Sequence, residues 1–315
     1  MQRPTGPSLG TLSSASHTSA SRPLIGIALL ILSAWILSAL DASAKWIMAA
    51  GVSLWFVCWV RYTVHLIVVL ALLLPRHGVA ILRSRRPRAQ ILRASAMLCS
   101  TLSFFTTLSY MPQAEATAIN FLAPLLVLAA APWLLKEPPR ASRWIAAAVA
   151  FAGVLIIIRP DSGLHPTGVF FGLLTAFCFA AQFIATRLVA ADNPYTSVIW
   201  SGSIGTLCMT LCLPIILPPV LPILSELSVG DWILLLSTGF SGALGHLMQI
   251  AAYRNASAST LAPFIYLQIV SASAIGWLVW GQLPDLITWI GISIICASGM
   301  VIGWLEWRRS KQFSR

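Results

Sequence analysis

The chain has 315 residues, of which 58% are hydrophobic and only 9% are charged, and its mean hydropathy is +0.84. Because a soluble domain carries about a quarter charged residues, this composition excludes an ordinary soluble protein and predicts an integral membrane protein. The formal net charge is +11. The 6 cysteines lie in apolar stretches and form no CxxC pair, so we expect neither a disulfide framework nor a metal site.

The first 22 residues differ in composition from everything that follows. They are rich in Ser, Thr, Gly and Pro, and they contain no acidic residue and no apolar run. This composition predicts a disordered cytoplasmic tail. An organelle-targeting peptide is the alternative, but the two arginines of this stretch are few for that class.

Ten apolar segments follow the tail, and each is close to the length of about 20 residues that a membrane-spanning helix needs. The segments are 24–46, 53–74, 91–110, 114–135, 142–158, 167–189, 195–217, 231–252, 257–280 and 286–305. The fifth is the shortest. We therefore predict an all-α integral membrane protein with about ten transmembrane helices.

The basic residues predict the orientation of these helices. Most of the 20 Lys and Arg residues fall in segments that share one side of the membrane if the N-terminus is cytoplasmic, and the exceptions are Lys45, Arg61 and Arg159. Cytoplasmic loops of membrane proteins carry an excess of Lys and Arg. We expect a protein of the bacterial inner (plasma) membrane, with both termini in the cytoplasm. The basic charge then reflects topology, and no nucleic-acid partner is expected.

The sequence repeats itself at a distance of 142 to 145 positions. The matched pairs are Gly26 with Gly168, Ala34 with Ala176, Lys45 with Arg187, Tyr110 with Tyr253, Thr117 with Thr260, and Trp144 with Trp289. Five crossings fall in each half, and an odd number forces the second copy to insert upside down. Inverted repeats typically enclose a site near the bilayer midplane. The expected parts are a tail 1–22, repeats 23–160 and 161–307, and a basic cytoplasmic tail 308–315.

Polar residues inside membrane helices are costly, and they usually face a cavity or a partner. In the outer half of the bilayer, the first helix carries Asp41 and Lys45 four residues apart, and the second carries Arg61 and His65 at the same spacing. Two further residues sit at this level between the third and fourth helices, Tyr110 and Glu115. Asp41–Arg61 and Glu115–Lys45 bridges are compatible with this arrangement. The alternatives are ion pairs that only lock helices together, or an outer gate or substrate contact.

The second half carries its polar residues nearer the inner side. Gln182 lies on the sixth helix, and His246 and Gln249 lie on one stripe of the eighth. A packing histidine and hydrogen-bonding glutamines between helices are the alternatives to ligand contacts. Two more candidates are Asn120, on a polar stripe of the fourth helix, and Tyr266, an aromatic residue suited to a cavity wall.

Three prolines fall inside predicted membrane helices, and each one permits a bend. They are Pro124, Pro132 and Pro263. A proline in a helix leaves a carbonyl without its partner, which permits a hinge at that point.

Three stretches carry a resemblance to a known family: "SALDASAKW" from Ser38, "WVRYTV" from Trp59, and "AEATAINFLAPLLVLAAAPWLLKEPPRASRWIAAAVAFAGVLIIIRP" from Ala114. With the duplicated five-helix unit, they resemble the EamA-type branch of the drug/metabolite transporter superfamily. The resemblance implies a cavity walled by helices one to four and six to nine, with helices five and ten peripheral. In that family a Glu ends both the fourth and the ninth helix. Here Glu137 holds the first position, but Gln282 holds the second, which is a departure.

The resemblance implies substrates such as amino acids, nucleotide-like cofactors, vitamins or drugs. The first helix of this chain has an Asp-x-x-x-Lys pattern, and in this it is similar to the family members that move S-adenosylmethionine or riboflavin. We expect a secondary transporter that moves a small polar or amphipathic organic metabolite by alternating access. A membrane-embedded transferase acting on a lipid head group, and a channel or scaffold, are the alternatives.

Several features of an enzyme are missing from the sequence. It contains no Gly-rich phosphate loop, no HExxH motif and no GxSxG motif, so neither an enzyme nor a cofactor is expected. The expected partners are a small-molecule substrate and the lipid bilayer, with a homodimer as the alternative to a monomer. Asp41, Glu115 and His246 are the candidate proton carriers. Arg61 and Lys45 lie near Asp41, so we favour facilitated exchange or weak proton coupling over an obligatory proton pump.

Overall fold

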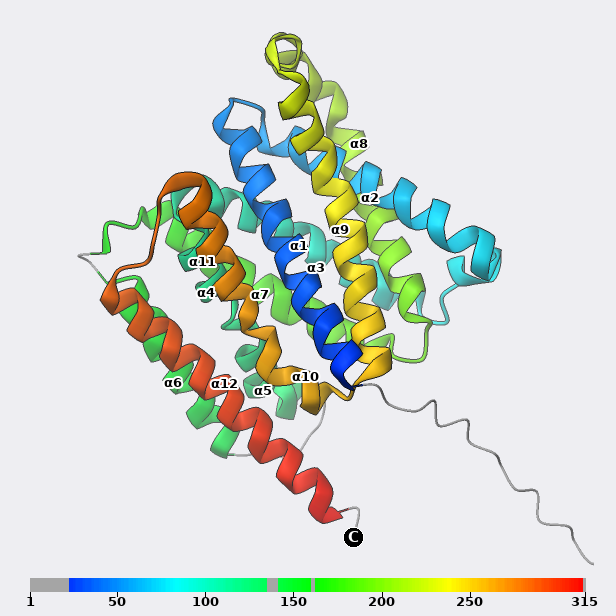
Figure 1. Cartoon of the computed structure of the whole chain (residues 1–315). Coiled ribbons are helices and arrows are strands. Elements are labelled where there is room, and N and C mark those ends of the chain that lie inside the picture. The colour runs from blue at the N-terminus through cyan, green and yellow to red at the C-terminus, as the bar shows by residue number, and fades with distance from the viewer. Residues whose placement is uncertain (1–22, 135–140, 160–161, 314–315) are drawn as a thin grey trace, which may run out of the picture.

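The computed structural model describes residues 23–134, 141–159 and 162–313, and in these the chain is a bundle of helices joined by short connectors (Figure 1). The elements are α1 (Pro23–Ala49), α2 (Leu54–His77), η1 (Val79–Leu82), α3 (Pro87–Tyr110), α4 (Gln113–Asn120), α5 (Ala123–Leu134), α6 (Ala141–Ile157), α7 (Pro166–Leu188), α8 (Pro194–Glu226), α9 (Val229–Asn255), α10 (Ala258–Ile265), α11 (Leu267–Trp280) and α12 (Leu286–Phe313). The expected tail 1–22 and Glu137 lie outside the described residues.

The helices confirm the expected number of membrane crossings. Within the described residues, 9 helical spans are long and apolar enough to cross a membrane, and the short apolar helix Trp144–Ile157 supplies the fifth crossing. The seventh crossing is longer than expected, because α8 continues to Glu226. The last crossing is longer as well, because α12 continues to Phe313.

Two of the ten crossings are broken into pairs of helices. The fourth is divided between α4 and α5 at residues 121–122, and the ninth between α10 and α11 at Tyr266. The first break follows from Pro124, which has no N–H and leaves the carbonyl of Asn120 without its helical partner. Pro263 lies shortly before the second break. Pro132 lies inside α5 without dividing it into two helices.

Each repeat packs its first helix against a helix of the other repeat. Helix α1 of the first repeat packs along α9 of the second, and the equivalent pair, α7 and α3, packs in the same way (Figure 1). The matched glycines mark these contacts. Gly26 lies against Ala256 of the α9–α10 junction, and Gly168 lies against Tyr110 of the α3–α4 junction. The duplicated sequence is therefore also a duplicated set of contacts, as two inverted five-helix repeats require.

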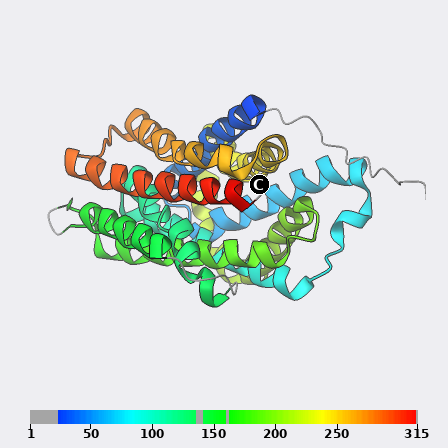
Figure 2. The same ribbon diagram turned by 90° about the horizontal axis from the view of Figure 1, so that it is seen from below.

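Helices α6 and α12 form a separate pair at one edge of the bundle, away from α2 (Figures 1 and 2). Gly153 and Gly291 let the two backbones approach closely. The hydroxyl of Ser298 donates to the carbonyl oxygen of Ala146 at 2.7 Å. An ion pair between Arg159 and Asp285 joins the connectors beside the two helices. This arrangement agrees with the peripheral fifth and tenth helices that the resemblance implies.

Candidate functional site

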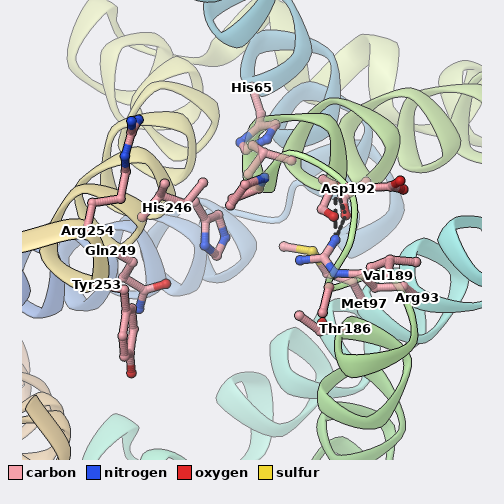
Figure 3. A pocket seen from close by; sticks show the side chains of 16 residues that line it. His65, Arg93, Met97, Thr186, Val189, Asp192, His246, Gln249, Tyr253 and Arg254 are labelled. Carbon is pink, nitrogen blue, oxygen red and sulfur yellow. Dashed lines mark hydrogen bonds between the residues drawn. The ribbon is translucent and has the colours of Figure 1, made fainter. Parts of the chain in front are cut away.

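A cavity of about 370 Å³ lies between α2, α3, α7, α8 and α9, so both repeats supply its wall (Figure 3). Its lining residues are His65, Arg93, Met97, Thr186, Val189, Ala190, Asp192, Pro194, Ser197, Val198, Ser201, His246, Gln249, Ile250, Tyr253 and Arg254. Exposed residues at its rim, Ala190, Pro194 and Arg254, open it to the surface. We call this end of the bundle the mouth end. The opposite end, which holds Lys45, is the closed end.

Glycines on α8 and α9 allow α2 to reach the cavity. A methyl group at Gly239 would lie 2.4 Å from Cβ of Val64, and one at Gly205 would lie 2.3 Å from the ring of Tyr62. Both distances are far shorter than van der Waals contact, so only glycine lets α2 lie this close to its two neighbours. The close approach places His65 on the cavity wall.

Arg93 ties three helices together beside the cavity. Its Nε donates to Oγ1 of Thr186 at 2.9 Å, and its Nη1 donates to the carbonyl oxygen of Ser197 at 2.9 Å and to Oγ of Ser201 at 2.6 Å. All of these acceptors are neutral. Within the part of the chain that the structure describes, no carboxylate lies within ion-pair distance of Arg93. Its positive charge therefore has no direct counter-ion.

Two histidines from opposite repeats face each other in the cavity wall. The ring centroids of His65 and His246 are 5.9 Å apart, and the rings meet edge to face. The Nε2 atom of His246 is buried and has no hydrogen-bond partner. Gln249 lies about one turn further along α9 and also lines the cavity. The sequence pattern assigned His65 to the outer half of the bilayer, but the structure places it beside His246.

Neither of the two expected ion-pair bridges forms among the described residues. Asp41 is only 8% exposed and acts on Arg61 through space. Arg61 instead donates from Nη1 to Oγ1 of Thr101 at 3.0 Å, while its Nε is buried without a partner. Glu115 and Lys45 likewise interact only through space. Arg61 and Lys45 each donate to neutral acceptors instead.

At the closed end, Lys45 joins three helices. Its Nζ donates to the carbonyl oxygen of Met111 at 3.0 Å and to Oε1 of Gln282 at 3.4 Å. The ammonium also lies 5.0 Å from the centre of the Trp280 ring, within the range of a cation–π interaction. Beneath Lys45, the hydroxyls of Ser38 and Ser271 are hydrogen-bonded at 2.7 Å. Both hydroxyl-bearing residues are fully buried.

The remaining predicted residues lie away from the cavity. Tyr110 is partly exposed and stacks on His165, with ring centroids 4.9 Å apart. Asn120 ends α4 at the first helix break, and its Oδ1 is buried without a partner. Gln182 is buried on α7, and its Oε1 also lacks a partner. Tyr266 lies at the second break, with its ring 5.0 Å from that of Phe121. Of the polar residues singled out in the sequence as candidate contacts, the structure thus brings His65, His246 and Gln249 to the cavity.

Asp192 is the acidic residue of the cavity lining, and it holds two connectors together at the mouth end. Its carboxylate accepts hydrogen bonds from the hydroxyl of Ser84, from Nε2 of Gln90 at 2.9 Å, and from the backbone N–H of Arg85 at 2.9 Å. Partial desolvation opposes ionisation, but these hydrogen bonds together outweigh it and lower the pKa of Asp192 below its ordinary value. The carboxylate is therefore engaged in structure.

Sequence reasoning missed Arg93 and Arg254 as cavity residues, because both were counted among the cations of cytoplasmic segments. The four-residue spacing of Arg93, Met97 and Thr101 places them on one helical face, and this signal was available in the sequence. In the described part of the chain, no group of three or more His, Cys, Asp or Glu side chains is placed to hold a metal ion.

Comparison with known proteins gives a family match in both halves of the chain. The model of the EamA-like transporter family matches residues 24–159 and again residues 166–304. A solved crystal structure that is 21% identical covers 91% of this chain and 97% of its own chain with a TM-score of 0.62. At that identity, the likeness shows a shared fold.

Similar proteins include named transporters from bacteria. The S-adenosylmethionine uptake transporter of Rickettsia bellii is 28% identical over 283 residues, which cover 90% of this chain and 94% of that protein. The pseudopaline exporter CntI of Pseudomonas aeruginosa is 28% identical over 223 residues, or 70% of this chain and 76% of that protein. The riboflavin transporter of Brucella anthropi is 24% identical over 269 residues, or 84% and 93%.

Proposed function

The chain belongs to the EamA-like transporter family, and we propose that it carries its small-metabolite substrate through the cavity between α2, α3, α7, α8 and α9. The single observation behind this proposal is a cavity of about 370 Å³, with charged and polar side chains in a mostly apolar wall, that opens at one end of a bundle of membrane helices. That volume lies within the usual range for small-molecule sites. The transferase, channel and scaffold alternatives have no support from the similar proteins, which are named as transporters.

The duplicated contacts support alternating access as the mechanism. Because α1 packs on α9 as α7 packs on α3, the same contacts can form at either end of the bundle. The structure has its cavity at the mouth end, and Lys45 joins helices at the other. If each repeat took up the arrangement that the other has now, the mouth end would close and the opposite end would open.

We assign the ten sequence-predicted residues to different stages of this cycle. His246 and Gln249 contact substrate in the arrangement that the structure has. Asp41 and Arg61 lie deeper and contact it as it passes. Asn120 and Tyr266 lie at the helix breaks and bend with them. Four residues remain: Lys45, Tyr110, Glu115 and Gln182. We assign them to the closing of one end of the bundle or to contacts with substrate later in the cycle.

The direct test is transport by the purified full-length chain in proteoliposomes. Vesicles are loaded with candidate metabolites, including S-adenosylmethionine and riboflavin, and both uptake and efflux are measured because the similar proteins include importers and exporters. Counterflow of a labelled metabolite is expected without an imposed pH gradient, as facilitated exchange requires. Failure to move any solute, together with modification of a lipid, would replace this proposal by the transferase alternative.

We also propose a bacterial inner membrane location with both termini in the cytoplasm, which puts the mouth end on the cytoplasmic side. Arg88 and Glu226 are exposed near opposite ends of the bundle. In a variant without native cysteines, Arg88→Cys should react with an impermeant thiol reagent only from the cytoplasmic side, and Glu226→Cys only from outside. Reaction of both from one side would contradict this topology. The mass of the protein in detergent, measured by light scattering, distinguishes a monomer from a homodimer.

A further inference from the structure

The charges that line the cavity are unbalanced. Arg93 and Arg254 contribute two guanidinium groups to its wall. Both donate to neutral oxygens: Arg93 to side chains and backbone of α7 and α8, and Arg254 from Nη1 to the hydroxyl of Tyr195 at 3.0 Å. The single lining carboxylate, Asp192, is occupied by Ser84, Gln90 and the backbone of Arg85. The cavity therefore presents net positive charge to whatever enters it.

Arg93 is half-buried, so its charge is only partly hydrated in the empty protein. Its side chain reaches into the bundle from the second turn of α3, where it is surrounded by Met97, Ser201 and Thr186. A charge removed from water costs several kcal/mol unless an opposite charge compensates it. Since the described residues provide no such group, an anion in the cavity is the natural counter-ion.

Unused hydrogen-bond donors point into the same region. Arg93 makes its hydrogen bonds from Nε and Nη1, and its Nη2 makes none to the described residues. Across the cavity, Nε2 of His246 is buried without a partner (Figure 3). One free guanidinium nitrogen and one imidazole nitrogen equal in number the two oxygens of a carboxylate. A phosphate, with more oxygens and more charge, needs a larger set of donors.

The geometry points to a carboxylate-bearing organic anion as the substrate class of this cavity, with Arg93 as its charge partner and His246 as its second donor. This inference rests on the proposed transport through the same cavity. The remaining wall supplies a surface for the organic part of the molecule, because Met97, Val198 and Ile250 are apolar and Tyr253 is aromatic. A substrate whose only charge is positive is disfavoured by the same guanidinium groups.

The test compares three probes of equal size on the purified full-length protein: 3-phenylpropanoate, 3-phenylpropanamide and 3-phenylpropylamine. Binding is measured by equilibrium titration and by thermal unfolding. The acid should bind at least about tenfold more tightly than the amide, because a hydrogen bond to a charged group contributes more than a neutral one. The amine should bind more weakly still. Equal affinity for acid and amide, or tighter binding of the amine, would overturn the inference while leaving transport itself in place.

Variants then test whether Arg93 is the charge partner of the bound acid. Arg93→Gln should weaken binding of the acid by about tenfold and leave the amide unchanged. His246→Gln is a second variant that preserves the bonds of Arg93 to α7 and α8, and it should act in the same direction. Arg88→Gln is the matched control, since it removes an exposed cation from the same helix outside the cavity. If Arg88→Gln weakens binding of the acid as much as Arg93→Gln does, the effect comes from the net charge of the protein, and the assignment to Arg93 is overturned.

Two further outcomes separate this inference from the proposed function. Displacement of the acid by chloride at equal concentration would mean that the cavity holds any small anion, which contradicts a substrate role. No binding by any probe also counts against the inference, and the proteoliposome assay then decides the proposed function by itself. Transport of a neutral or cationic metabolite alone would keep the function and reject the carboxylate.

Discussion

The buried polar side chains of this bundle fall into two kinds. In the first kind the hydrogen-bonding atoms are used inside the protein, as when Nε2 of Gln113 donates to the carbonyl oxygen of Ser38 at 2.8 Å. In the second kind they are unused, as with Nε of Arg61 and Nε2 of His246. An unsatisfied buried polar atom costs about 1–3 kcal/mol. Residues of the second kind are therefore poor structural elements and good candidates for contact with substrate or water.

Asp41 provides a prediction at this scale. It is nearly fully buried, and it makes no hydrogen bond or ion pair with the described residues. Asp41→Asn therefore breaks no hydrogen bond to the described residues, and it should lower transport far more than it lowers folded yield. The same substitution removes the negative charge that acts on Arg61. We expect transport to fall by at least about tenfold, measured per mole of folded protein in proteoliposomes.

Asp285→Asn is the control for Asp41→Asn, because it removes an exposed carboxylate whose ion pair with Arg159 lies away from the cavity. A surface ion pair of this kind contributes about 0–1 kcal/mol, so neither yield nor transport should change. The functional role of Asp41 is rejected if Asp41→Asn lowers folded yield and transport in the same proportion.

The sequence predicted which residue types carry the chemistry better than it predicted their neighbours. Helical spacing alone indicated that His246 and Gln249 share a face, and the structure puts both on the cavity wall. The meeting of His65 with His246 depends on the tilt of α2 against α9, and single-helix periodicity does not contain that information. Arg93 was hidden by its position, because a cation near a helix end fits the charge pattern of a cytoplasmic loop equally well.

At the scale of elements, the cavity depends on close helix contacts, and Gly239→Ala tests them. The new methyl group would lie 2.4 Å from Cβ of Val64 and 2.8 Å from the carbonyl oxygen of Arg61, so α2 has to move. Overpacking of this kind costs about 1–3 kcal/mol, and we expect a lower melting temperature in detergent. Because His65 moves with α2, substrate binding should weaken as well.

The control for Gly239→Ala is Gly230→Ala on the same helix. There the added methyl group would lie 3.6 Å from Oγ of Ser228, an ordinary contact. Since alanine favours a helix more than glycine does, this variant should be as stable as the parent or slightly more so. Equal destabilisation by both substitutions would show that glycine is needed for flexibility in α9 and not for the approach of α2.

The connectors at the mouth end give a pH-dependent prediction. The lowered pKa of Asp192 means that its carboxylate stabilises the fold above its unfolded pKa, near 4, and that this contribution is lost as pH falls through the lower folded value. Asp192→Asn should therefore lower the melting temperature at pH 7 by about 2 °C. The difference from the parent should shrink below about pH 4.

Ser84→Ala is the partner variant for Asp192, because it removes one of the hydrogen bonds that favour the ionised carboxylate. The double variant should be no less stable than Asp192→Asn alone, as expected for two residues that act through one contact. A difference that stays constant from pH 7 to pH 3 would contradict the role assigned to the carboxylate charge.

Element boundaries also show how far local rules reach. Pro124 permits a bend, and a break lies directly before it because the proline ring excludes a helical partner for the carbonyl of Asn120. Pro132 obeys the same local rule, yet α5 continues through it. Neighbouring helices can re-satisfy or shield a freed carbonyl in a membrane bundle, so proline permits a break without requiring one. Tertiary packing decides which of the two occurs.

At the scale of the whole molecule, the two ends of the bundle are in different states. The mouth end has the cavity, whereas the closed end has Lys45 above a fully buried layer that includes Ser38 and Ser271. A transporter that alternates needs its two states to differ by only a few kcal/mol. In the proposed cycle the contacts of Lys45 belong to the arrangement that is closed at this end, so they bias the equilibrium toward it.

Lys45→Met should shift this bias, because methionine keeps the bulk of the side chain but loses the bonds to Met111 and Gln282 and the cation–π contact. Each such bond contributes about 0.5–1.5 kcal/mol, and loss of one bond corresponds to a population shift of about two- to thirteenfold. The measurement uses Ser271→Cys, which is isosteric and buried beneath Lys45. Its reaction with an impermeant thiol reagent added at the closed end should accelerate by that factor in Lys45→Met.

The same substitution must act in the opposite sense at the mouth end if one equilibrium governs both. Ser201→Cys lines the cavity, and its reaction from that side should slow in Lys45→Met as the population of the mouth-open arrangement falls. Lys45→Arg keeps the charge and a donor, so it should leave both rates near those of the parent. If Ser271→Cys accelerates while Ser201→Cys does not change, the substitution has only loosened local packing, and Lys45 does not couple the two ends.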